Sequence, residues 1–454
     1  MSTVRIIVRV SLGALALSGC ARNLCDGDPE NPLCTVYPAP GSMMVTVSPA
    51  RLSLTSGGTL AIAVNPLPPE GSSLVLRRQG AMDLKLGSMT DGKLTATVKP
   101  AELTGRGFTP GAAQIALIQP DEPDRTAALR LFVDPKFDKA AKLYDTSTSS
   151  DFPLWLTINK TSTIYTLNQF PPFAGSMERQ LRIGEYQLAN GAIAPRVPQT
   201  FGAYRAYPFA SGAPGLAALA RMGVVLLSRN PVSQLNPVLA DYCLFSTAQC
   251  QSINPTTLGF KSASAFAADR QGSLFTVQTE LGTLAYRASE MNPFAEKLAI
   301  DNGNRPTPGT VAAQACGDLD GDGQSDLIVF QAAPAGVSVF LGQPDGLKLR
   351  YNDAVSERLQ TVLGTKTVAA AAVADIDADG LDDLLVVRDG VISLLLNQGN
   401  GTLAAGPQWN ALAAADSLAV GVMDAVPSTW GKLDIAVSTS TGQQVAVFVN
   451  QAAY

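Results

Sequence analysis

Short apolar runs separated by glycine-rich turns recur along most of the chain. Between residues 41 and 134 these runs alternate apolar and polar positions, as strands with one buried face do. The runs are Met44–Val47, Leu60–Val64, Ser73–Leu76, Leu94–Val98, Ala113–Ile118 and Ala128–Val133. Six or seven strands in about 95 residues predict a two-sheet β-sandwich. No long amphipathic helix is evident.

A longer period of roughly 50 residues begins at residue 136. Asp269, Asp318, Asp375 and Asp424 each follow a run of small apolar residues, and the clearest repeats give strand, acidic loop, strand, turn and strand. Four short strands at this period form the blade of a β-propeller. Residues 136–454 hold about six such units. A strand near residues 140–144 would complete the last one, and a stack of sandwiches is the rival fold.

Two nine-residue stretches, 318–326 and 375–383, concentrate carboxylates between strand-like runs. Each has Asp at positions 1, 3, 5 and 9 and Gly at position 6. Carboxylates this close repel one another unless a cation lies between them, and hard oxygen ligands suit calcium. An EF-hand needs Glu at position 12, where this chain has Val329 and Val386. We therefore predict two calcium loops between β-strands, with a solvated acidic turn as the alternative.

Residues 311–402 resemble the FG-GAP repeats, also called VCBS repeats, of integrin α-subunit propellers and bacterial surface proteins. This resemblance implies one structural Ca²⁺ in each loop. The implied ligands are Asp318, Asp320, Asp322, the Gln324 carbonyl and Asp326 in the first loop, and Asp375, Asp377, Asp379, the Leu381 carbonyl and Asp383 in the second.

The expected fold class is all-β. An N-terminal β-sandwich over 41–134, similar to immunoglobulin-like (Ig-like) modules, precedes a six- or seven-bladed β-propeller over 136–454. The repeats around Asp269 and Asp424 lack most of the acidic positions. We expect neither of those two repeats to bind metal.

The N-terminus is similar to a bacterial lipoprotein signal. Arg5 and Arg9 precede a short apolar run that ends in Leu17-Ser18-Gly19-Cys20. The resemblance implies cleavage after residue 19 and acylation of Cys20, which anchors the chain in a lipid bilayer. Residues 20–40 would form a proline-rich tether. We expect a cell-envelope location, at the outer membrane, while an ordinary cleaved signal is the alternative.

Five further cysteines follow Cys20. Cys25 and Cys34, and likewise Cys243 and Cys250, are close enough in sequence for small-loop disulfides in an exported protein. Cys316 stands among apolar neighbours, which indicates a buried thiol rather than a reactive one.

The chain contains no histidine, which excludes Ser-His-Asp and Cys-His catalysis and histidine-ligated metals. A net charge of −5 gives no electrostatic basis for nucleic-acid binding. Paired-carboxylate chemistry stays open. The candidate acids are Glu178, Glu185, Asp241, Glu280 and Glu290, and the candidate sugar-stacking residues are Trp155, Trp409 and Trp430. No spacing among the acids identifies a catalytic pair.

The preferred functional hypothesis is a lipid-anchored adhesion or binding protein of the envelope, without catalysis, whose propeller binds a glycan or a protein partner. The alternative is an enzyme that acts on polysaccharides with two propeller carboxylates. A scaffold component of the outer envelope is a third hypothesis.

Overall fold

The computed structural model is all-β, as the sequence predicts, with two short helices among the described residues. It describes residues 44–119, 123–138, 141–145, 152–158, 163–170, 180–189, 192–196, 216–220, 223–229, 238–246, 249–253, 260–289, 292–301, 310–399, 401–423, 432–439 and 443–452. In these segments no helix has the length and apolar character needed to cross a membrane.

Several sequence predictions lie outside the described residues. They are the signal at 1–19, the tether at 20–40, Cys20, Cys25, Cys34, Glu178, Glu290, Asp424, Trp430 and the side chain of Trp155.

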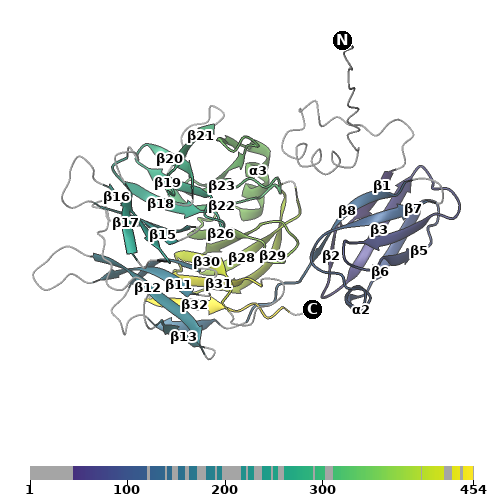
Figure 1. Cartoon of the computed structure of the whole chain (residues 1–454), viewed down its shortest axis with the longest axis horizontal. Helices are drawn as coiled ribbons and strands as arrows, with labels where there is room; N and C mark the ends of the chain where they lie inside the picture. The colour runs from purple at the N-terminus through teal and green to yellow at the C-terminus, as the bar shows by residue number, and fades with distance from the viewer. Residues whose placement is uncertain are drawn as a thin grey trace, which may run out of the picture.

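The N-terminal part forms two sheets that face each other across one core (Figure 1). The three-stranded sheet has the order β1 (Met44–Ser48), β3 (Gly58–Asn65), β6 (Lys93–Val98). The five-stranded sheet has the order β2 (Arg51–Ser53), β8 (Arg125–Phe132), β7 (Gly111–Ile118), β4 (Ser73–Arg77), β5 (Leu84–Gly87). Alternate residues of β3, β4, β7 and β8 fill the core, which explains the period-2 pattern in the sequence. The helix α2 (Pro100–Thr104) follows β6.

The rest of the described chain consists of consecutive four-stranded antiparallel units. The first two are β10 (Phe152–Ile158), β11 (Thr163–Phe170), β12 (Gln180–Ala189), β13 (Ala192–Pro195), and β14 (Leu216–Ala220), β15 (Gly223–Arg229), β16 (Val238–Leu244), β17 (Gln249–Ile253). The third and fourth are β18 (Ala263–Ala268), β19 (Leu274–Thr279), β20 (Gly282–Arg287), β21 (Glu296–Asp301), and β22 (Thr310–Gly317), β23 (Asp326–Ala333), β24 (Ala335–Gly342), β25 (Lys348–Tyr351). A parallel pairing of β21 with β25 joins these two.

The fifth unit is β26 (Ala370–Ala374), β27 (Asp383–Arg388), β28 (Val391–Asn397), β29 (Leu403–Asn410). The last contains β30 (Ser417–Gly421), β31 (Asp434–Thr439), β32 (Gln444–Phe448) and, from far earlier in the chain, β9 (Lys142–Asp145). β9 pairs antiparallel with β32, so the strand predicted near residues 140–144 does complete the last unit.

The first strands of the units follow one another around a closed circuit. β10 lies beside β14, β14 beside β18, β18 beside β22, β22 beside β26, and β26 beside β30, which lies beside β10 again. Residues 384–387 of β27 are fully buried, and alternate residues belong to different hydrophobic clusters. Leu384 and Val386 pack in a cluster shared with the fourth unit. Leu385 and Val387 pack in a cluster shared with the last unit. Neighbouring units thus cover both faces of each sheet, which explains continuous apolar runs in place of strict alternation.

The helix α3 (Asp353–Leu363) is a short amphipathic helix that the strand pattern of the sequence did not predict. The Asn352 side chain caps its N-terminus by accepting a hydrogen bond from the Val355 N–H at 3.0 Å. Val355, Leu359 and Leu363 recur at a spacing of four and pack into the core of the fourth and fifth units.

Candidate metal centre

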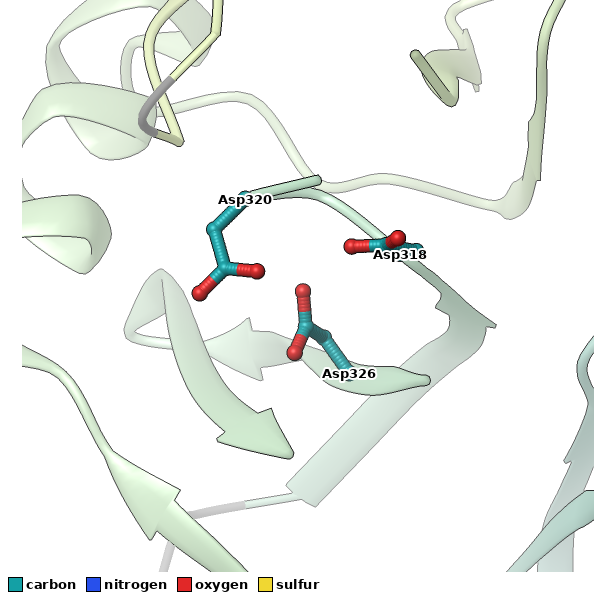
Figure 2. A group of neighbouring side chains, drawn as sticks. All are labelled: Asp318, Asp320 and Asp326. Carbon is teal, nitrogen blue, oxygen red and sulfur yellow. The ribbon is translucent and has the colours of Figure 1, made fainter. Parts of the chain in front are cut away.

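The first acidic loop connects β22 to β23, and three of its carboxylates point toward one another (Figure 2). Asp318, Asp320 and Asp326 each offer one oxygen, and these oxygens lie within 4.8 Å of one another. Asp326 is fully buried, whereas Asp318 and Asp320 are half-buried. The structure therefore brings together positions 1, 3 and 9 of the predicted ligand set.

The backbone of this loop wraps around Asp318. Its Oδ1 accepts the N–H of Gly321 at 2.7 Å, and its Oδ2 accepts that of Gly323 at 2.8 Å. Both glycines have left-handed φ angles of 80° and 86°. Asp322 Oδ1 accepts the Gln324 N–H at 2.7 Å, so positions 5 and 7 contact each other and lie outside the three-carboxylate group.

The second loop, between β26 and β27, repeats this geometry. One oxygen from each of Asp375, Asp377 and Asp383 lies within 4.8 Å of the others. Ala378 has a φ of 62° where the first loop has Gly321, which shows that the turn is kept although alanine tolerates it poorly. At positions 5 and 7, Asp379 Oδ1 accepts the Leu381 N–H at 2.8 Å.

The Asp at position 9 has a second role, as a buried hydrogen-bond acceptor. Asp326 Oδ2 accepts the N–H of Leu319 at 2.7 Å, and its Oδ1 accepts that of Gly342, at the end of the third strand, at 2.8 Å. Asp383 makes the same pair of bonds with Ile376, at 3.0 Å, and Asn397, at 2.8 Å. Each position-9 carboxylate therefore joins the start of its loop to the end of the third strand.

The last unit keeps this hydrogen-bond pair although it lacks the acidic loop. Asp434 accepts the N–H groups of Met423 at 2.6 Å and Asn450 at 2.7 Å. Gly421 pairs with Asp434 across β30 and β31, as Gly317 pairs with Asp326 across β22 and β23. Val422, the residue after Gly421, therefore corresponds to Asp318 and occupies position 1 of the loop. The sequence alignment of Asp424 with Asp318 and Asp375 is therefore wrong by two residues. The error arose because small apolar residues precede both Val422 and Asp424, so the sequence alone does not choose which of the two stands at position 1.

Contacts between units link the two loops. Asp382 Oδ2 accepts the Asp318 N–H at 3.0 Å, and Asn397 Nδ2 donates to the Leu319 carbonyl at 2.8 Å. On the other side of the first loop, the Ser325 hydroxyl donates to Asp269, which also accepts the Ser273 N–H at 2.7 Å. Sequence reasoning missed Asp382 and Asn397. Asn397 is the last residue of the third strand β28, and Asn450 comes two residues after the third strand β32, so this repetition was a usable signal.

Two arginines of the N-terminal sheets reach the second loop, and sequence reasoning missed both. Arg51 Nη2 forms an ion pair with Asp377 and lies 3.0 Å from Asp379 Oδ2. Arg130 Nη1 donates to the Asp379 carbonyl at 3.2 Å. In the described part of the chain, no ion pair reaches Asp318, Asp320, Asp322 or Asp326, so the two loops differ in their electrostatic surroundings.

Burial of so many carboxylates raises their pKa values. Burial, then the neighbouring Asp322 and Asp318, raises the pKa of Asp320 to about 7. In the second loop burial and Asp379 raise the pKa of Asp375 to about 7. The pKa of Asp377 is also raised to about 7 by burial and Asp379, against the opposing effect of Arg51. Without a cation, Asp320, Asp375 and Asp377 therefore hold their protons to a much higher pH than an ordinary aspartate does.

The residues present fit a hard divalent cation. Each group consists of carboxylate oxygens, which is the donor set that Ca²⁺ prefers. Asp375 Oδ1 is buried without a hydrogen-bond donor among the described residues, as an oxygen free to coordinate a metal would be. Both acidic groups can therefore hold a metal ion.

The raised pKa values predict that the stability of the metal-free protein falls as pH rises, and that the stabilisation by calcium grows as pH rises. A carboxylate with a raised folded pKa stabilises the fold below its unfolded pKa, near 3.8, and this contribution is lost as pH rises through about 7. In EDTA the melting temperature should therefore fall from pH 5 to pH 8, and less steeply in Asp320→Asn. Because calcium needs deprotonated ligands, its stabilising shift should grow over the same range. Thermal melts in both buffers measure this, and a calcium shift that is larger at pH 5 contradicts it.

The candidate catalytic acids that are described each have a partner near them in the chain. Glu185 is buried and pairs with Arg196 at 3.3 Å, and Asp241 accepts the Ser252 hydroxyl at 2.7 Å. Glu280 accepts the Lys261 N–H at 2.6 Å. These acids belong to three different units, β12, β16 and the turn after β19, so the structure does not assemble them into one site.

The remaining predicted residues have structural surroundings. Cys243 and Cys250, on the paired strands β16 and β17, form a disulfide. Cys316 is a buried free thiol, and burial raises its pKa far above the usual range. The Trp409 ring packs edge-on against Phe137, with centroids 4.7 Å apart.

Similarities of the whole chain to known proteins are distant. A search of curated proteins gives no match. Among solved structures, the chain is similar to the Photorhabdus luminescens Tc holotoxin pore, at 12% identity and a TM-score of 0.38, over 87% of this chain and 18% of that one. It therefore spans less than a fifth of that protein.

Two further solved structures are similar at low identity. One is an Agrocybe aegerita lectin described as recognising non-reducing terminal N-acetylglucosamine (14% identity, TM-score 0.35, 74% of this chain and 88% of that one). The other is PorZ, described as an essential surface component of the type-IX secretion system of Porphyromonas gingivalis (9% identity, TM-score 0.34, 76% of this chain and 37% of that one).

The model of the FG-GAP-like repeat matches residues 318–386 and 375–425. These matches begin at the first Asp of each acidic loop. The protein therefore carries FG-GAP-like repeats in the segment that contains both acidic loops.

Proposed function

We propose that the four-stranded units form a six-bladed β-propeller and that the N-terminal sheets form an Ig-like β-sandwich. The closed circuit from β10 to β30 supports the propeller, because first strands line the centre of such a ring. The pairing of β9 with β32 supports six blades, since it closes the ring with strands from both ends of this region. The two facing sheets and their shared core support the sandwich.

We propose that the acidic groups are structural calcium sites. Asp318, Asp320 and Asp326 would hold the ion in the first loop, and Asp375, Asp377 and Asp383 in the second. The ion would neutralise carboxylates that otherwise repel one another. The carboxylates of Asp322 and Asp379 and the carbonyls of Gln324 and Leu381 belong to the proposed ligand set through the family resemblance alone.

The function that these features support best is partner binding at the cell envelope, without catalysis. The observation that carries this proposal is the structural role of the acids at position 9. Asp326 accepts two backbone N–H groups, and Asp434 accepts an equivalent pair in the last unit, which lacks the acidic loop. An ion at such a position tightens the connection between strands and leaves the surface loops of the ring to bind a glycan or a protein.

The location proposed is the bacterial envelope, with Cys20 acylated. The Leu17-Ser18-Gly19-Cys20 sequence supports it. In bacteria that express the chain, a fatty acid label should enter the protein and be lost in Cys20→Ser, which should also leave the membrane fraction. Label retained in Cys20→Ser contradicts acylation at this residue.

A glycan array and a polysaccharide-degradation screen, run on the same preparation, test binding against catalysis. We expect saturable binding of a glycan, or capture of an envelope protein, with no release of products. Release of products by the purified protein would contradict the proposal and favour the carboxylate-pair enzyme.

A further inference from the structure

Arg51 is a buried cation supplied to the second loop by another part of the chain. It lies on β2, 8% exposed, and contacts Asp377 and Asp379, which are fully buried. Its guanidinium also lies over the Phe132 ring, 4.6 Å from the centroid. Asp379 Oδ2 makes no hydrogen bond among the described residues, so its partner there is the charge of Arg51.

The same contact attaches the N-terminal sheets to the ring. The Val133 N–H donates to the Asp377 carbonyl at 2.9 Å, and Arg130 donates to the Asp379 carbonyl at 3.2 Å. At the other end of the ring region, Ala452 is buried in the core of the N-terminal sheets. The second loop is thus part of a contact between two distant segments, whereas the first loop faces the third and fifth units.

Arg51 and calcium would use the same carboxylate. Asp377 belongs to the group that can hold a metal, and it is also the residue that Arg51 pairs with. A guanidinium and a divalent ion at one buried carboxylate repel each other strongly, because the low dielectric of a buried site screens charges weakly.

We propose that Arg51 serves as the built-in cation of the second loop, so that calcium and the docked N-terminal sandwich compete for Asp377. Calcium fills the first loop freely. It enters the second loop only when Arg51 leaves, which loosens the sandwich from the ring. This inference rests on the proposed calcium sites.

Calcium titration by calorimetry tests the competition in the full chain. We expect one stronger site and a second that is about 5- to 150-fold weaker, the range typical of coupled sites. Asp320→Ala should remove the stronger site. Arg51→Met, which keeps the length and apolar stem of the side chain, should bring the second site to the affinity of the first.

Two matched variants control for a general loss of charge. Arg51→Lys keeps a cation at the loop and should titrate like the wild type. Arg77→Met removes an arginine of the same sandwich that pairs with Asp83 and Asp124, away from the loop, and should leave both affinities unchanged.

The outcomes separate the inference from the calcium proposal. Two equal sites in the wild type that Arg51→Met does not alter overturn the role of Arg51 and leave the calcium sites intact. Weaker binding in Arg51→Met also overturns it, because Arg51 would then help to form the site. No binding in any variant overturns both. If Arg51→Met does not fold, small-angle scattering of the wild type decides: saturating calcium should increase the radius of gyration, and an unchanged radius overturns the inference.

Discussion

Replacing Asp434 by alanine is expected to lower the free energy of unfolding by about 3–6 kcal/mol, because hydrogen bonds to a charged group contribute about 1.5–3 kcal/mol each. The fully buried Asp434 carboxylate accepts two backbone N–H groups, from Met423 and Asn450. Alanine would leave both donors buried without a partner. Chemical denaturation, with the change in midpoint and slope, measures the loss.

The effect of Asp434→Ala should be the same in calcium and in EDTA, because Val422 stands at position 1 of this loop. Asp434→Asn keeps one oxygen acceptor and should lose about half as much stability. A loss below 1 kcal/mol for Asp434→Ala, or one that appears only in calcium, would show that the carboxylate does not brace the unit as described.

Removing the closing strand is expected to be the second large change. β9 pairs with β32 through four residue pairs. Replacing residues 142–145 by Gly-Ser-Gly-Ser keeps the chain length but weakens this strand, since glycine and serine favour it poorly. At roughly 0.5–1.5 kcal/mol for each lost backbone hydrogen bond, the cost is about 2–6 kcal/mol. An unpaired β32 should also promote self-association.

Leu143→Thr is the matched control for this replacement. The Leu143 side chain is largely exposed and threonine favours strands, so the pairing should survive with little change in stability. Thermal melts and sedimentation of both variants measure the difference. A Gly-Ser replacement that melts like Leu143→Thr and stays monomeric contradicts closure of the ring through β9.

The acidic loops and the strands beside them were predictable because their signals are local. Carboxylates at positions 1, 3 and 9 converge because the turn that places them is encoded within nine residues, including Gly323 and Gly380. The closing strand was predictable from the incomplete last repeat. The helix α3 was missed although Asn352 and the four-residue spacing of Val355, Leu359 and Leu363 encode it, because it is an addition to the four-stranded repeat, between β25 and β26.

Contacts between distant segments could not be predicted from the sequence. Arg51 and Asp377 are separated by 326 positions, and no local pattern distinguishes Arg51 from other arginines on strands. The double role of Asp326 and Asp383 was also hidden, since a metal ligand and a backbone acceptor are the same residue type. Only the position of Asp434 opposite Gly421 shows that the acceptor role exists without the rest of the acidic loop.

A thermal melt of the wild-type chain in calcium and in EDTA, beside the Asp320→Ala/Asp377→Ala double variant, tests the central claim that the acidic loops hold structural calcium. For dissociation constants of about 10⁻⁴–10⁻³ M, calcium at about 1 mM contributes about 0.4–1.4 kcal/mol for each filled loop. The wild type should therefore melt at a lower temperature in EDTA, and the double variant should melt alike in both buffers. A wild-type melt that chelation leaves unchanged contradicts the claim.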